Sequence, residues 1–204
     1  MRINKKKFLY LISPNKIYKY FFKDLKSVLD TKKIAFFQLR LKKENQINKL
    51  KIAKKIQKIC KDFKVKFIIN DDPNLAKKIN ADGCHLGQND MSIIDARKII
   101  KKKIIGITCH NSINLAKIAN KVNADYIAFG AFNTTKTKKV KYKADIKIIK
   151  KLKKTSRIPV VAIGGINNLN YKKLLLNKAD FLAISSYVWN NKKLKPLEAI
   201  KLLK

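Results

Sequence analysis

Polar side chains that could bind a phosphorylated ligand stand at the end of an apolar run near residue 38. The segment Gln38-Leu39-Arg40-Leu41-Lys42 places an amide and two cations at alternate positions. Because side chains alternate along a strand, Gln38, Arg40 and Lys42 share one face, opposite the two leucines. This face predicts a diphosphate site, and the alternative is an exposed strand end.

Acidic side chains follow the next two apolar runs. Asn70-Asp71-Asp72 closes one run, and Asp90 lies just after the other. With 13 acidic and 49 basic residues in the chain, acids at two neighbouring strand ends stand out. Asp72 before Pro73 is also typical of a turn or helix start. Asp71 and Asp90 predict a Mg²⁺ site, since magnesium takes one or two carboxylates and completes its shell with water and phosphate oxygens.

Hydroxyls and lysines follow the apolar run at 126–132, in the order Thr135, Lys136, Thr137, Lys138. A solvated loop would explain them in so basic a chain. The sharper hypothesis is an anion cradle, because hydroxyls donate to phosphate oxygens and an ammonium group neutralises their charge.

Small residues end the last two apolar runs, with Gly164-Gly165 after one and Ser185-Ser186 in the other. Paired glycines let backbone amides approach a phosphate, and serines add hydroxyl donors. Either pair alone is a weak signal, but together they predict a second anion site, for a monophosphate.

The two histidines, His85 and His110, each follow a cysteine directly. Adjacent residues face opposite sides of a strand, so a soft-metal site is not expected, and each histidine is interpreted as structural. No nucleophile, base and orienting residue form a triad. The chemistry that remains is substitution at a phosphorylated carbon, driven by stabilisation of the leaving group.

These side chains need elements that bring strand ends together. Apolar runs of strand length alternate with segments of helical period, such as 45–63 with Ile47, Ala53 and Ile56 on one face. Eight runs in 204 residues predict an α/β fold, a (β/α)₈ TIM barrel in one domain over 1–204, with an open doubly wound sheet as the alternative. Both folds place a ligand at the carboxyl ends of the strands. The predicted strands are 8–12, 34–41, 65–70, 83–87, 104–110, 126–132, 160–165 and 181–188.

A short repeat precedes three of these strands: Asn80-Ala81-Asp82, Asn123-Ala124-Asp125 and Lys178-Ala179-Asp180. Asn takes the left-handed conformation that ends a helix, whereas Lys does so with some strain. We therefore interpret each copy as a junction between a helix and the next strand.

The composition is that of a globular protein, with 46% apolar residues and a formal net charge of +36. Such a charge suggests nucleic acid or an anionic surface, but the lysines are spread over the chain and accompany many Ile and Asn residues, which fits A/T-rich coding. Three widely spaced cysteines argue against a disulfide framework. No apolar stretch approaches the roughly 18 residues of a membrane span. We expect a cytoplasmic protein with small phosphorylated partners, no nucleic acid and no membrane; its oligomeric state is open.

In order along the chain, QLRLK, IIND, ADGCHLGQND, GITCHN, ADYIAFGAFNTTKTK and VVAIGGI resemble the thiamine-phosphate synthase family. The resemblance runs from about residue 34 to 188. It implies a (β/α)₈ barrel that joins hydroxymethylpyrimidine diphosphate to hydroxyethylthiazole phosphate, giving thiamine phosphate and pyrophosphate. In the mechanism it implies, pyrophosphate leaves first with help from Mg²⁺, and the thiazole nitrogen then attacks a pyrimidine-stabilised cation without a general base.

The resemblance also implies roles for individual residues. Asp71 and Asp90 match the magnesium ligands, and Arg40, Lys42, Thr108 and Lys138 match residues with catalytic roles. The pyrimidine-diphosphate contacts would be Gln38, Leu39, Arg40, Leu41, Lys42, Asn70, Thr108 and Lys138. The thiazole-phosphate contacts would be Thr135, Lys136, Thr137, Gly165, Ser185 and Ser186.

Some positions depart from the family pattern. Leu41 stands where Glu is common, Thr134 where Pro is common, and Thr108 where Ser is common. A related branch of the fold, the thiazole tautomerases, uses a histidine and no diphosphate, so His110 keeps that alternative open. A tautomerase has no use for the cations and acids together. A non-enzymatic basic RNA-binding protein is the alternative of a different class, although no RNA-binding module is recognisable.

Overall fold

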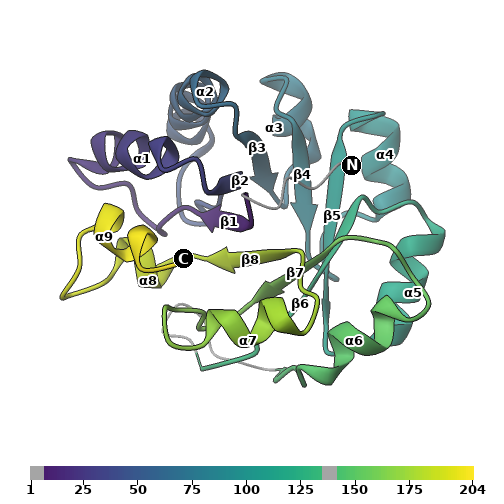
Figure 1. Cartoon of the computed structure of the whole chain (residues 1–204). Helices are drawn as coiled ribbons and strands as arrows, with labels where there is room; N and C mark the ends of the chain where they lie inside the picture. Colours follow the sequence, from purple (N-terminus) through teal and green to yellow (C-terminus); the bar gives the residue numbers. More distant parts are fainter. Residues whose placement is uncertain (1–6, 135–141) are drawn as a thin grey trace.

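The computed structural model describes residues 7–134 and 142–204. Within them, eight short parallel strands close into a barrel in chain order, with β8 paired to β1 (Figure 1). Continuous apolar runs suit such strands, because both of their faces are covered. The TIM barrel predicted from the sequence is confirmed. Its strands are β1 (Leu9–Ile12), β2 (Ile34–Leu39), β3 (Lys66–Asn70), β4 (Gly83–Leu86), β5 (Ile104–His110), β6 (Tyr126–Gly130), β7 (Val160–Ile163) and β8 (Phe181–Ile184).

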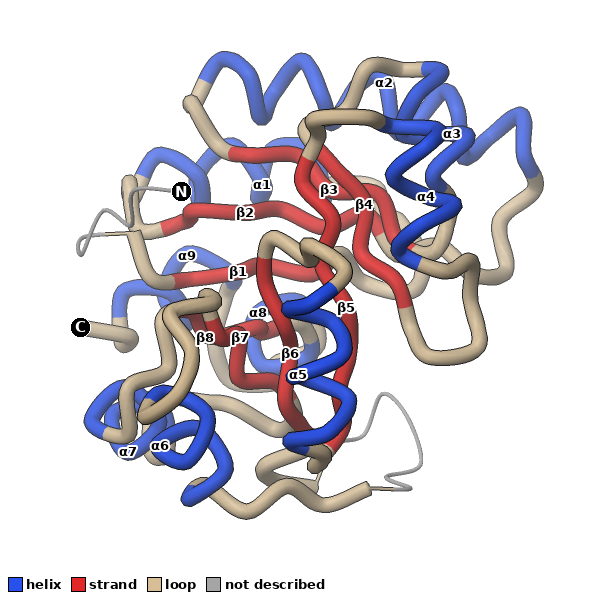
Figure 2. Tube along the Cα trace, turned by 90° about the vertical axis from the view of Figure 1, so that its right-hand side faces the viewer, coloured by secondary structure: helices blue, strands red, loops and turns tan. Residues whose placement is uncertain are grey.

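Helices alternate with the strands and lie around the outside of the barrel (Figure 2). Across 7–134 and 142–204, none is long and apolar enough to cross a membrane. The helices are α1 (Phe21–Asp30), α2 (Gln46–Asp62), α3 (Pro73–Lys78), α4 (Ile93–Ile100), α5 (Ile113–Lys121), α6 (Lys147–Lys153), α7 (Tyr171–Leu176), α8 (Ser186–Trp189) and α9 (Pro196–Lys201).

The apolar side chains form two layers. The larger layer packs between the strands and the helices, where α2 contributes Ala53, Ile56 and Cys60. The smaller layer fills the barrel and includes aromatic rings in contact: the ring of Phe36 lies 5.2 Å from that of Tyr10 and 5.1 Å from that of Phe181. These rings form the floor beneath the carboxyl ends of the strands.

Several sequence expectations about strand ends and buried faces were wrong. The strands predicted over 34–41, 126–132 and 160–165 end at Leu39, Gly130 and Ile163. The strand predicted over 181–188 ends at Ile184, because a short helix, α8, begins at Ser186. Ile47, expected on the buried face of α2, is 69% exposed, since the buried stripe of that helix begins only at Ala53.

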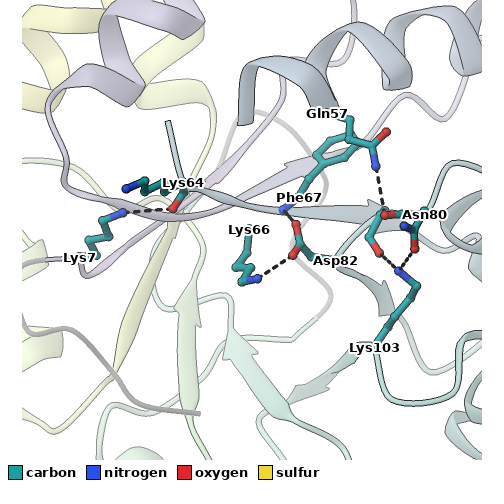
Figure 3. A network of polar contacts seen from close by, with 9 residues as sticks. Lys7, Gln57, Lys64, Lys66, Phe67, Asn80, Asp82 and Lys103 are labelled. Atoms are coloured by element: carbon teal, nitrogen blue, oxygen red, sulfur yellow. Dashed lines mark hydrogen bonds and ion pairs between the residues drawn. The ribbon is translucent and has the colours of Figure 1, made fainter. Parts of the chain in front are cut away.

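The Ala-Asp repeat has one structural role in its three copies. In the first copy, the Asp82 carboxylate accepts the backbone N–H of Phe67 at 2.9 Å and pairs with Lys66 at 2.8 Å (Figure 3). The Asp82 backbone N–H donates in return to the Phe67 carbonyl. The carboxylate thereby extends the parallel ladder before the first residue of β4, at the amino-terminal edge of the barrel.

The other two copies repeat this arrangement. Asp125 accepts the N–H of Ile105 at 2.8 Å, and Asp180 accepts that of Val160 at 2.7 Å. The residues two positions earlier, Asn80, Asn123 and Lys178, have φ of 57°, 61° and 70°. The predicted left-handed junctions are confirmed, including the one at lysine.

Candidate active site

A cavity of about 380 Å³ opens at the carboxyl ends of the strands. Its volume lies within the range of small-molecule sites. The structure brings together here most of the described residues that the sequence singled out. These are Gln38, Arg40, Lys42, Asn70, Asp71, Asp90, Thr108, Gly165, Ser185 and Ser186.

Strand β2 and the residues directly after it form the basic side of the cavity. Gln38 is buried and donates through Nε2 to Asn70 Oδ1 at 2.5 Å. Arg40 is half-buried, and its guanidinium donates to Asn15 Oδ1 at 3.3 Å. The Lys42 ammonium lies 2.8 Å from Asp71 Oδ2. The predicted alternation is confirmed, since the three polar side chains line the cavity together.

The prediction that Leu39 and Leu41 contact the pyrimidine substrate stays a prediction. Both side chains are 3% exposed and pack in the layer between the barrel and its helices, outside the main cavity. The alternation that turns Gln38 and Arg40 inward turns these leucines outward.

The two predicted metal ligands lie side by side. The Asp71 N–H donates to the His85 carbonyl at 2.8 Å, with a left-handed φ of 62° at Asp71. Asp90 Oδ2 accepts the Gly87 N–H at 2.7 Å. Partial burial, with a hydrogen bond to the Asp71 carboxyl, raises the pKa of Asp90.

This pair fits a hard cation, because two adjacent carboxylates repel each other when both are ionised. Within the described ranges, no three His, Cys, Asp or Glu side chains gather as a metal site. Two carboxylates are nevertheless enough for Mg²⁺ when phosphate oxygens and water complete the shell. Asp72 is separate from the pair, since its carboxylate caps α3 by accepting the Leu75 N–H at 2.8 Å.

The glycines and serines form the opposite side of the cavity. Gly165 has φ of +58°, and a Cβ there would lie 2.2 Å from the carbonyl oxygen of Thr134. Only glycine therefore lets the loop after β7 pack against the start of the loop after β6. Ser185 Oγ donates to the Ser13 carbonyl at 3.1 Å, and Ser186 begins α8.

The predictions for Thr135, Lys136, Thr137 and Lys138 concern residues outside the described ranges, so they stay predictions. The described residues on either side of this segment both belong to the barrel mouth. Thr134 adjoins Gly165, and Tyr142 lines the cavity with its backbone carbonyl accepting the Ala131 N–H at 2.9 Å.

Both histidines contact neighbouring side chains, as expected for structural residues. His110 stacks on Tyr142 with ring centroids 4.3 Å apart. His85 is buried, with Nδ1 at 3.0 Å from the Tyr126 hydroxyl and Nε2 at 2.9 Å from Thr108 Oγ1. Burial lowers the pKa of His85 to about 4, so its ring is neutral at neutral pH.

Sequence reasoning missed the two buried tyrosines beneath the cavity. Tyr10 Oη lies 2.8 Å from Tyr126 Oη and donates to Gln38 Oε1 at 2.8 Å. A buried tyrosine hydroxyl needs a hydrogen-bond partner. A tyrosine within an apolar strand could therefore have indicated a buried polar contact inside the barrel.

A (β/α)₈ barrel with acids, cations and Gly/Ser loops at the carboxyl ends of its strands belongs to the class of barrel enzymes that handle phosphorylated small molecules. Comparison with known proteins defines the family. Residues 9–188 match the family model described as thiamine monophosphate synthase. The chain belongs to this family.

Individual relatives agree with this assignment. A thiamine-phosphate synthase of Pelagibacter ubique (strain HTCC1062) is 68% identical, with all of both chains covered. One from Nitrosomonas eutropha is 41% identical over 77% of this chain and 74% of its own. Among solved structures, a thiamine phosphate pyrophosphorylase from Pyrococcus furiosus superimposes with a TM-score of 0.86 at 28% identity, covering 98% of this chain and 94% of that one.

Proposed function

We propose that this protein acts as a thiamine-phosphate synthase, a transferase of thiamine biosynthesis. It joins hydroxymethylpyrimidine diphosphate to hydroxyethylthiazole phosphate and releases pyrophosphate. The observation that carries the proposal is the pairing of two unlike sets of residues in one cavity, the acids and cations after β2 to β4 and the Gly/Ser loops after β7 and β8. The family and its 68% identical relative support the same reaction.

Different residues bind the two substrates. Arg40 and Lys42 hold the diphosphate, and Gln38, Asn70 and Thr108 hold the pyrimidine portion. Gly165, Ser185 and Ser186 hold the thiazole phosphate. Lys138, Thr135, Lys136 and Thr137 complete the two sites as predictions from the sequence. This arrangement keeps the thiazole nitrogen facing the carbon from which the diphosphate leaves.

The reaction needs charge stabilisation more than proton transfer. The C–O bond to the diphosphate breaks and its electron pair leaves with pyrophosphate, after which the thiazole nitrogen forms the new C–N bond with its lone pair. Mg²⁺ held by Asp71 and Asp90 would neutralise part of the charge on the leaving group. Arg40 and Lys42 add fixed positive charge at the same place. We place the enzyme in the cytoplasm, since Cys60, Cys84 and Cys109 are unpaired.

The deciding experiment incubates the protein with both phosphorylated substrates and Mg²⁺ and measures thiamine phosphate and pyrophosphate in equal amounts. Omission of either substrate is the control. A protein that isomerises the thiazole precursor but forms no thiamine phosphate would instead be a tautomerase, and one that binds RNA with a steep salt dependence but forms no product would be a nucleic-acid-binding protein.

A further inference from the structure

A continuous chain of hydrogen bonds crosses the interior of the barrel beneath the cavity. It uses one side chain from each of the strands β1 to β6. Tyr10 and Tyr126 are 1% exposed, Gln38 is 3% and His85 is 9% exposed. We call this chain the interior relay; in spatial order its members are Asn70, Gln38, Tyr10, Tyr126, His85 and Thr108.

The direction of the interior relay follows from counting donors. Tyr10 donates its only hydroxyl proton to Gln38 Oε1, so Tyr126 must donate to Tyr10 across the 2.8 Å contact between their hydroxyls. The proton of Tyr126 is then used, and His85 must donate from Nδ1 to the Tyr126 oxygen. A neutral imidazole with a proton on Nδ1 has a bare Nε2.

The two ends of the interior relay lie at the cavity. The bare Nε2 of His85 accepts the hydrogen bond from the Thr108 hydroxyl. Because the only hydroxyl proton of Thr108 is then used, Thr108 Oγ1 can act toward a ligand only as a hydrogen-bond acceptor. At the other end, Gln38 donates to Asn70 Oδ1, which leaves the Asn70 amide protons as donors. Both end residues line the cavity.

The backbone is adapted to hold Tyr126 in this chain. A Cβ built on Gly106 of β5 would lie 1.9 Å from Cζ of Tyr126. The ring therefore occupies space that only glycine leaves open, and it stacks on His85 with centroids 5.6 Å apart. This packing fixes the hydroxyl between Tyr10 and His85.

We propose that His85, Tyr126 and Tyr10 are positioning residues that hold Thr108 as a hydrogen-bond acceptor and Asn70 as a donor toward the ligand. The site would thus select a heterocycle that presents an N–H donor, such as an amino substituent, to Thr108. This assignment rests on the proposed function, since it concerns the pyrimidine substrate of that reaction.

The first test uses Tyr126→Phe and Tyr10→Phe, which keep the rings and remove a link. We expect the KM for the pyrimidine diphosphate to rise about fivefold or more, and that for the thiazole phosphate to change less than about twofold, as for loss of one neutral hydrogen bond. The matched control is Tyr171→Phe, another buried tyrosine, whose hydroxyl bonds the backbone of Lys204. It should lose stability without changing either KM.

A double-mutant cycle separates positioning from general stability. Thr108→Val removes the hydroxyl that the interior relay orients, and Thr108→Ser retains it. If Tyr126 acts through Thr108, Tyr126→Phe should have almost no further effect on the pyrimidine KM in the Thr108→Val protein and its full effect in the Thr108→Ser protein. Equal effects in both backgrounds would overturn the proposal.

The donor-to-acceptor direction of the interior relay can be measured without substrate. The chain has two histidines, so ¹⁵N-histidine NMR gives two spin systems, and His85→Gln assigns them. The interior relay predicts a proton on Nδ1 and a bare Nε2 in His85. A proton on Nε2 would reverse the direction, make Thr108 a donor and refute the ligand assignment. Absence of thiamine phosphate formation by the wild-type protein would instead refute the proposed function. The tautomer of His85 would still show in which direction the hydrogen bonds of the interior relay run.

Discussion

Two aspartates at the residue scale carry the proposed metal chemistry. Asp71→Asn and Asp90→Asn each remove one negative charge from the pair while keeping its shape. If the pair holds Mg²⁺ on the leaving diphosphate, kcat should fall by about 10²-fold or more, taking loss of one preorganised charge-stabilising group as the guide. Steady-state kinetics over a magnesium titration measures this effect.

Asp72→Asn is the matched control for that experiment. It changes the neighbouring acid, whose carboxylate caps α3, and Asn also serves as an N-cap. It should leave kcat and the magnesium dependence close to those of the wild type. Wild-type activity at the usual magnesium concentration in Asp71→Asn or Asp90→Asn would remove that residue from the metal site.

The two serines after β8 allow a test of which side of the cavity holds which substrate. Ser185→Ala combined with Ser186→Ala should weaken binding of the thiazole phosphate, by roughly 1.5–3 kcal/mol for each hydroxyl that bonds a charged acceptor. Separate binding isotherms for the two substrates measure it, and Ser27→Ala on the outer helix α1 is the control. Equal losses for both substrates would mean that the two anion sites are assigned wrongly.

The sequence located individual site residues well where strand alternation applies. Gln38, Arg40 and Lys42 could be placed on one face because period two is fixed by backbone geometry. The interior relay could not be predicted, since its six members come from six strands and only the closed barrel brings their side chains into contact. Leu39 and Leu41 were predicted through resemblance alone, and resemblance does not separate backbone contacts from side-chain contacts.

At the scale of elements, the Ala-Asp repeat explains how short strands stay in register. The Asp180 carboxylate accepts the Val160 N–H and lies 2.6 Å from the Lys153 ammonium, with both side chains mostly buried. Asp180→Ala leaves that N–H and the ammonium without their acceptor. The free energy of unfolding should fall by about 1.5–3 kcal/mol, the value of hydrogen bonds to charged groups.

Chemical denaturation with kinetics of the folded protein tests this prediction. Because Asp180 lies at the amino-terminal edge of the barrel, kcat and both KM values should stay unchanged. Asp95→Ala is the control: its ion pair with Lys98 is exposed on α4 and should contribute little to stability. Loss of activity without loss of stability in Asp180→Ala would contradict a purely structural role.

The sequence predicted elements better than their ends. The eight strands were recognisable because continuous apolar runs indicate burial on both faces. The end of β8 was missed because α8 has only four residues, too few to show helical period. The role of the repeat was missed as well, since the carboxylate bonds a strand that lies about 20 residues away.

At the scale of the whole molecule, the formal net charge of +36 suits the phosphorylated substrates of the proposed reaction. Such a field raises the encounter rate with phosphorylated substrates and is screened by salt. The fold explains how so basic a chain keeps an acid pair at its site: Lys42 lies against Asp71, and the Gly87 N–H holds Asp90. The net charge alone would suggest nucleic acid, but the even spread of the lysines fits A/T-rich coding, and the residues at the strand ends indicate chemistry on phosphorylated substrates.

The stability of the whole molecule should depend on pH through one buried histidine. Burial lowers the pKa of His85 from 6.5 to about 4. Between these values the unfolded chain binds a proton that the folded protein does not, so the free energy of unfolding falls as the pH drops from 6.5 to 4. At about 1.36 kcal/mol per pH unit, the loss from this group is roughly 3 kcal/mol.

Carboxylates also titrate in this range, so the contribution of His85 is the difference between two curves. Urea denaturation of the wild type and of His85→Gln should show a wild-type advantage that is about 3 kcal/mol larger at pH 7 than at pH 4. Tyr171→Phe is the control, because it removes buried hydrogen bonds without a group that titrates here, and its curve should run parallel to that of the wild type. A parallel curve for His85→Gln as well would mean that the pKa of His85 is the same in the folded and the unfolded protein, so that burial does not lower it.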